Sequence, residues 1–186
     1  MAQANPEKRL SDAALKCLAK ARWDEISLAD VAKTAKLSFA QLQPLAPAKP
    51  ALLGLLLKRF GAETARRYKP DADSASARER LFDVAMTWFD ALKPHRKSVR
   101  NLYDGLKRDP LALLATRGEI MRAAQWLFAL AGADTGPAVP LRAMAYAAML
   151  ARAVPLWLDD DADLSKTMAA LDRGLSRATN MFGARG

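Results

Sequence analysis

Residues 27–53 read SLADVAKTAKLSFAQLQPLAPAKPALL, and this stretch holds two helix starts separated by a very short turn. Ser27 is followed three residues later by Asp30, and Ser38 is followed at the same spacing by Gln41. This spacing is typical of capping boxes, in which the serine and the later side chain each accept a hydrogen bond from the other's backbone N–H. Only the letters AKL separate the two expected helices, so the stretch predicts a helix-turn-helix.

The neighbouring segments supply the helices that would support this motif. Asn5 and Pro6 form a helix start, with a capping side chain followed by proline at the first helical position. Apolar residues at helical spacing then predict a first helix over about 6–22. After the motif, the letters ALLGLLLKRF lie within a long apolar helix expected over about 48–68.

The remainder of the chain is also helical in pattern. The letters KPDADSAS, polar and rich in turn residues, are the clearest break, and five further helix-like segments follow, each closed by proline, glycine or aspartates. We therefore predict an all-α protein. A helix-turn-helix domain occupies residues 1–48, a connecting helix occupies about 48–68, and a helical ligand-binding and dimerisation domain occupies 69–186.

Composition narrows the function classes. The chain of 186 residues has a net charge of +9, of which residues 1–60 carry +5, and a basic surface favours nucleic acid or anionic lipid as a partner. Its apolar runs are too short to cross a bilayer, and the start has no apolar core of a secretory signal. Cys17 is the only cysteine and His95 the only histidine, so we expect a cytoplasmic protein that is not an enzyme and has no metal or cofactor.

The amino-terminal pattern resembles the TetR family of bacterial transcriptional regulators. The resemblance is carried by DAALKCLAKARWDEISLADVAKTAKLS and by Leu42, Lys49, Leu52 and Leu53 after it. It implies a TetR-like fold, in which the motif binds double-stranded DNA and a helical domain behind it binds a ligand and forms a homodimer. The implied function is a one-component regulator, typically a repressor.

Two departures from the family pattern affect the second helix of the motif, the reading helix, which would contact the DNA bases. Lys36 stands in the turn where the family usually has glycine, and LQPLA stands where it usually has an aromatic-rich LYxxF. Pro44 lacks the N–H that a helix needs, so the helix starting at Phe39 should be only about one and a half turns long. Gln43, which precedes the proline, should be pushed towards an extended backbone.

The side chains available for DNA are few. Glutamine can pair with adenine, whereas no arginine is present to bind guanine. Phosphate contacts would come from the lysines near the turn, with Arg22 as a further candidate. The expected DNA-binding residues are Lys33, Lys36, Ser38, Phe39, Gln41, Gln43 and Lys49. A helix-turn-helix kept only as a packing unit, without a DNA target, is the alternative.

Bulky side chains of the second half could line a pocket for a small apolar ligand. The candidate pocket residues are Trp88, Met121, Trp126, Met144, Met149 and Trp157. Ordinary core packing is the alternative for each of them.

A second resemblance supports a rival function. Trp126, the pair Ala131-Gly132, the letters WLDD from Trp157 and TMAALDRGL from Thr167 resemble the carboxy-terminal region of ubiquinone-biosynthesis accessory proteins. That resemblance implies a TetR-fold protein that binds a lipid or isoprenoid, with a vestigial helix-turn-helix. A membrane surface is an expected partner only under this alternative.

The last predicted helix has one apolar stripe. Its members, at roughly 100° per residue, are Leu164, Met168, Leu171, Leu175, Ala178 and Phe182. Lys166, Arg173 and Arg177 lie on the opposite side. The stripe could be covered by the protein's own core, by a second subunit or by an anionic membrane. We expect Leu171 to lie in a dimer interface.

Overall fold

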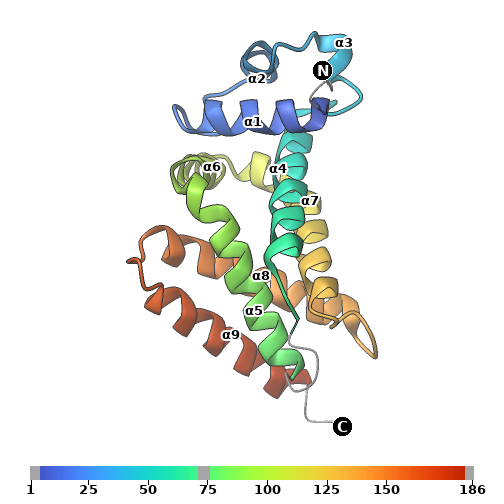
Figure 1. The fold of residues 1–186 in the computed structure, drawn as a ribbon, viewed down its shortest axis with the longest axis vertical. Helices are drawn as coiled ribbons and strands as arrows, with labels where there is room; N and C mark the ends of the chain where they lie inside the picture. The colour runs from blue at the N-terminus through green and yellow to red at the C-terminus, as the bar shows by residue number, and fades with distance from the viewer. Residues whose placement is uncertain (1–4, 71–75, 183–186) are drawn as a thin grey trace. The chain divides into compact units, whose positions relative to one another are not determined.

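The computed structural model describes residues 5–70 and 76–182, with side chains as far as Arg177. Its regular structure in these residues consists of α-helices and one short 3₁₀ turn, which confirms the all-α prediction (Figure 1). The elements are α1 Pro6–Leu18, α2 Leu28–Ala35, α3 Phe39–Leu42, α4 Lys49–Arg67, α5 Ala77–Leu92, η1 Lys93–His95, α6 Arg96–Arg108, α7 Pro110–Leu130, α8 Val139–Leu158 and α9 Ser165–Phe182.

The chain forms two compact units that are not consecutive in sequence. The first unit comprises Met1–Arg59 and Leu92–Ile120, and the second comprises Phe60–Ala91 and Met121–Gly186. Helices α4 and α7 therefore contribute residues to both units. The domain boundary expected near residue 69 stays a prediction, because residues 71–75 lie outside the described part of the chain.

Helix α1 begins where the sequence predicts. The Asn5 side chain accepts a hydrogen bond from the Glu7 N–H at 3.0 Å, and Pro6 takes the first helical position. The helix ends at Leu18 rather than near residue 22 as expected. After it, the N–H groups of Lys20 and Ala21 both bond to Cys17 O in a turn, and the chain continues to Trp23, whose side chain is almost completely buried in the first unit.

Both predicted capping boxes are present. At the start of α2, Asp30 N–H donates to Ser27 Oγ at 3.1 Å and Ser27 N–H donates to Asp30 Oδ2 at 2.9 Å. At the start of α3, Gln41 N–H donates to Ser38 Oγ at 3.3 Å and Ser38 N–H donates to Gln41 Oε1 at 3.0 Å. These local bonds satisfy N–H groups that lack a partner at a helix start, and they fix where each helix of the motif begins.

Helix α3 is as short as the proline suggested, but Gln43 does not have the expected backbone. The helix comprises four residues, and Gln43 has φ −50° and ψ −47°, which is helical rather than extended. The expectation for Gln43 was therefore wrong. The N–H of Gln43 bonds to Phe39 O at 2.9 Å, and the N–H groups of Leu45 and Ala46 both bond to Leu42 O. These bonds form a tight turn that keeps the backbone of Gln43 helical.

The second unit is built around large aromatic side chains and the pair α8 and α9, which lie side by side (Figure 1). Phe89 of α5 and Trp157 of α8 are fully buried, with ring centroids 5.6 Å apart. The start of α9 is held by buried Asp160, whose carboxylate accepts hydrogen bonds from the N–H and the hydroxyl of Thr167, both at 2.7 Å. The acidic stretch before α9 thus serves to cap that helix.

The stripe of α9 is covered by the protein's own core. Leu164, Leu171 and Leu175 are buried within the chain, whereas Met168 is exposed. The expectation that Leu171 lies in a dimer interface was therefore wrong, because this side chain has no surface left for a second subunit. The side chains of Ala178 and Phe182 lie outside the described residues.

Candidate nucleic-acid interface

The turn between α2 and α3 is held in a conformation that usually requires glycine. Lys36 ends α2 with φ 55° and ψ 45°, in the left-handed region. Arg9 of α1 supports this end, since its guanidinium donates to Ala35 O at 2.8 Å and to Lys36 O at 2.9 Å. A residue with a side chain therefore occupies a position suited to glycine, at the expense of backbone strain in Lys36.

That strain gives a prediction about stability. Lys36→Gly should raise the free energy of unfolding by about 0.5–1 kcal/mol, because glycine adopts positive φ without the steric penalty that other residues suffer. The matched control is Lys33→Gly in the last turn of α2. This change should lower the free energy of unfolding by about 1 kcal/mol, since glycine is unfavourable in a helix. Urea unfolding followed by circular dichroism measures both, and a Lys36→Gly protein as destabilised as the control would contradict the strain argument.

Four of the expected DNA-binding residues have side chains that extend from this motif into solvent. They are Lys33, Lys36, Phe39 and Gln43. Phe39 is 59% exposed, which is unusual for a phenylalanine and places an apolar ring at the start of α3 in contact with solvent. The two lysines flank the turn, one in the last turn of α2 and one at its end. The surface thus combines positive charge with one apolar and one amide side chain.

The side chains of Ser38 and Gln41 are already hydrogen-bonded within the motif. Both side chains belong to the capping box at the start of α3, with Gln41 Oε1 accepting from Ser38 N–H. Gln41 can form the bidentate pair with adenine, which uses Oε1 as well as the amide N–H, only by giving up this bond. Its two predicted uses, as a cap and as a DNA contact, are therefore in competition.

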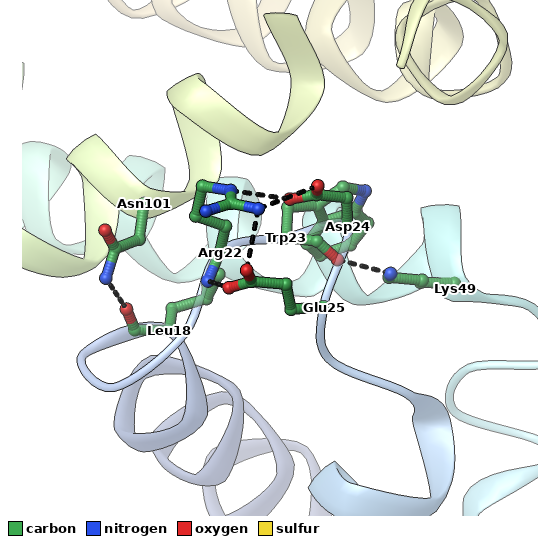
Figure 2. Close-up of polar contacts among 7 residues, drawn as sticks. All are labelled: Leu18, Arg22, Trp23, Asp24, Glu25, Lys49 and Asn101. Carbon is green, nitrogen blue, oxygen red and sulfur yellow. Dashed lines mark hydrogen bonds and ion pairs between the residues drawn. The ribbon is translucent and has the colours of Figure 1, made fainter. Parts of the chain in front are cut away.

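Lys49 and Arg22 point to internal partners (Figure 2). The Lys49 ammonium donates to Trp23 O and lies 4.9 Å from the centre of the Trp23 ring. Burial lowers the pKa of Lys49, while the nearby carboxylates of Asp24 and Asp109 oppose that shift. Arg22 lies between Asp24 and Glu25 and forms ion pairs with both. The sequence had suggested that both side chains are available for phosphates, but Lys49 is turned towards Trp23 and Arg22 is paired with two neighbouring carboxylates.

The loop that carries Trp23 is fastened to α6. Trp23 N–H donates to Asn101 O at 3.1 Å, and the Asn101 amide donates to Leu18 O at 2.7 Å (Figure 2). Gly105 allows close approach, since a Cβ at this position would lie 2.6 Å from Trp23 N. We call this cluster of Trp23, Lys49, Asn101 and Gly105 the loop clamp. Sequence reasoning missed it, because its members are far apart in the chain.

The six candidate pocket residues do not share one environment. Trp88, Met149 and Trp157 are buried in the second unit, Met121 is half-buried, and Trp126 and Met144 are exposed. The Trp88 and Phe89 rings pack edge to face with centroids 5.1 Å apart, which is ordinary core packing. The Trp126 ring would meet a Cβ placed on Gly61 at 3.3 Å, so it lies against α4. A ligand site among these residues stays a prediction.

Helix α8 has an exposed apolar face. Leu141, Met144, Ala148 and Ala151 are all exposed and fall within an arc of roughly 80° at the ordinary helical rotation. An apolar strip of this kind on a helix surface is a typical feature of an interaction face. In the described part of the chain, no helix has both the length and the apolar character needed to span a membrane.

Comparison with known proteins identifies the fold. No protein-family model matches the sequence, and no curated protein is similar to it. Among solved structures, a TetR transcriptional regulator from Nitrosomonas europaea ATCC 19718 is similar with a TM-score of 0.66 at 18% identity, over 95% of this chain and 99% of that one. A TetR transcriptional regulator from Rhodococcus sp. RHA1 gives a TM-score of 0.66 at 13% identity, over 93% and 94% of the two chains.

A third similar structure is TetR from Acinetobacter baumannii AYE, with a TM-score of 0.51 at 18% identity over 94% of each chain. Likeness at this level of identity defines the fold. The chain has the TetR fold, with a helix-turn-helix near its amino end, as the sequence resemblance implied.

Proposed function

We propose that this protein is a transcriptional regulator that binds double-stranded DNA through α2 and α3. The observation that carries the proposal is the capped helix-turn-helix with Lys33, Lys36, Phe39 and Gln43 exposed on it. Proteins of the same fold that are named as transcriptional regulators support it. These proteins give no support to the alternative, a lipid-binding accessory protein of ubiquinone synthesis.

The structure favours DNA binding dominated by phosphate contacts. Helix α3 has four residues, and Gln41 is held in its cap, so few side chains can reach base edges. Gln43 can pair with adenine, and the Phe39 ring can contact the methyl group of thymine. The lysines at the turn bind phosphates of any sequence. We therefore expect steep salt dependence and modest sequence specificity, with a preference for A·T pairs.

Removing the two lysines tests the phosphate contacts. In the Lys33→Ala, Lys36→Ala double variant, the slope of log affinity against log salt should fall by about 1.8, since each lost phosphate contact removes about 0.9. The matched control is Lys58→Ala, which removes one exposed charge of the same unit that is paired with Glu7 on α1. Fluorescence anisotropy with labelled genomic fragments measures both. Wild-type protein that binds no fragment at low salt would overturn the proposal.

A thymine-to-uracil exchange tests the role of Phe39. Uracil lacks the methyl group, so replacing the contacted thymine in a selected site should weaken wild-type binding by about fourfold, the contribution of one buried methyl group. The same exchange should have no effect on the Phe39→Ala variant, because the ring that contacts the methyl group is gone. An equal loss in both proteins at every thymine would exclude the contact.

We further propose that the protein is a homodimer with a small apolar ligand in the second unit. The exposed face of α8 is the proposed dimer surface, and the candidate pocket walls are Trp88, Met121, Met149 and Trp157. A two-fold dimer presents two reading helices, and a ligand that prefers one arrangement would shift the population able to bind DNA. Native mass spectrometry should show a dimer mass with a bound small molecule. Monomer mass at micromolar concentration would exclude the dimer.

A further inference from the structure

The start of α7 exposes three leucines to water. Leu111 is 78% exposed, Leu114 is 62% exposed and Leu113 is 46% exposed. They lie in the first unit, within two turns of the helix start at Pro110. Three exposed leucines so close together form an apolar patch rather than isolated surface residues, and such patches mark interaction sites. We call Leu111, Leu113 and Leu114 the leucine cluster.

The directions of these side chains indicate what kind of surface covers them. At 100° per residue, the residues of α7 beyond Leu111 that are not exposed within the first unit, Ala112, Thr116, Glu119 and Ile120, fall within an arc of roughly 100°. The leucine cluster spreads over roughly 160° of the remaining circumference. A folded partner packs against one side of a helix and would leave part of this arc in water. A lipid phase surrounds an inserted helix turn on every open side.

The backbone of this helix start is suited to an apolar environment. Pro110 has no N–H, the Ala112 N–H donates to Asp109 Oδ1 at 2.9 Å, and the Leu113 N–H donates to Asp109 O at 3.0 Å. Unpaired N–H groups are the main penalty for placing a helix end in lipid. At this start, most of that penalty has already been removed by one aspartate and one proline.

The exposed charged residues of the segment 107–118 are positive, and outside this segment the Asp24 carboxylate lies close enough to interact with Arg108. Lys107 and Arg108 precede the leucine cluster and Arg117 follows it, and all three are exposed. Asp109, the acidic residue of residues 107–118, is half-buried and caps the helix. This arrangement is complementary to a surface with apolar chains beneath a layer of negative phosphates. We propose that the leucine cluster, with Lys107, Arg108 and Arg117, binds the surface of an anionic lipid bilayer.

In this binding mode the leucines enter the boundary between headgroups and acyl chains, to a depth of about 5–10 Å. Lys107, Arg108 and Arg117 then lie at the level of the lipid phosphates. Binding is peripheral and reversible, since three leucines and three charges hold the protein without any spanning segment.

Co-sedimentation of the full-length protein with vesicles tests the proposal. The vesicles are phosphatidylcholine with about one third phosphatidylglycerol, compared with phosphatidylcholine alone. The Leu111→Ser, Leu114→Ser variant should lose about a hundredfold in partition coefficient, about tenfold for each leucine withdrawn from lipid. In the Lys107→Gln, Arg108→Gln variant, the partition coefficient should fall about 25-fold at low salt, and high salt should abolish this difference from the wild type. Both substituted pairs are exposed, so unfolding midpoints should stay unchanged.

The controls distinguish the leucine cluster from the other apolar and basic surfaces of the chain. Met168→Ser removes another exposed apolar residue, in the second unit, and should bind vesicles like the wild type. The Lys33→Ala, Lys36→Ala variant should bind DNA more weakly and keep most of its vesicle binding. Loss of vesicle binding in that variant, with the leucine variant unaffected, would show adsorption through the basic helix-turn-helix and overturn the proposal. If the leucine variant still binds vesicles but has a different oligomeric mass in light scattering, the leucine cluster contacts a second copy of the chain and the proposal is overturned.

Discussion

Leu171→Asp is expected to lower the free energy of unfolding by about 3–5 kcal/mol, because it places an unpaired carboxylate in a packed core. Leu171 is fully buried in the second unit, on α9, which packs against α8. For a chain of this length, such a loss corresponds to a fall of roughly 10 °C in the thermal midpoint. Circular dichroism at 222 nm during heating measures it.

Met144→Asp is the matched control for that prediction. Met144 is 51% exposed on α8, so the same carboxylate would remain hydrated and the midpoint of the isolated chain should hardly change. Because Met144 lies on the proposed dimer surface, the variant should instead become monomeric, as measured by light scattering. A Leu171→Asp protein that is monomeric and retains the wild-type midpoint would place Leu171 in the interface after all, against its burial within the chain.

Gly105→Ala is expected to destabilise the first unit by about 2–3 kcal/mol. The added Cβ would lie 2.6 Å from Trp23 N and 2.9 Å from Asp24 N, which are backbone atoms that cannot rotate away. The loop clamp must therefore open, and the steric penalty exceeds the gain of about 1 kcal/mol that alanine normally brings to a helix. Because the clamp buries Trp23, its emission spectrum should shift to longer wavelength in the variant.

Gly54→Ala provides the comparison, since Gly54 is also a helical glycine of the first unit. Its added Cβ would meet the carboxylate end of Glu119, a flexible side chain that can move aside. This variant should be neutral or more stable by up to about 1 kcal/mol. Equal stability changes in the Gly105 and Gly54 variants would show that the contact with Trp23 carries no special constraint.

The parts of the fold that depend on neighbouring residues were predictable. The starts of α2 and α3 follow from Ser27 with Asp30 and from Ser38 with Gln41, because a capping box is complete within four residues. The shortness of α3 follows from Pro44. The extended backbone expected for Gln43 failed because a proline only biases the residue before it, and the turn bonds to Leu42 O outweigh that bias.

The roles set by distant contacts were not predictable from a single sequence. Lys49 is the same residue type as Lys33 and Lys36. Its ammonium differs from theirs because it bonds to Trp23 O and lies against the Trp23 ring. Periodicity identified the apolar stripe that includes Leu171 but carried no information about what covers it. For the same reason, bulky side chains such as Trp126 and Met144 were expected in a pocket although the structure exposes them.

The loop clamp has a consequence for how this protein can be recombined with others. Residues 96–108 supply bonds that hold the end of α1 and the loop after it, including the Ser98 hydroxyl to Leu15 O at 3.0 Å and the Asn101 amide to Leu18 O. An amino-terminal cassette cut before α5 would leave Trp23 without the helix that covers it. In a chimera made by exchanging that cassette, the loop after α1 would therefore lack its contacts with α6, unless the matching α6 were transplanted with it.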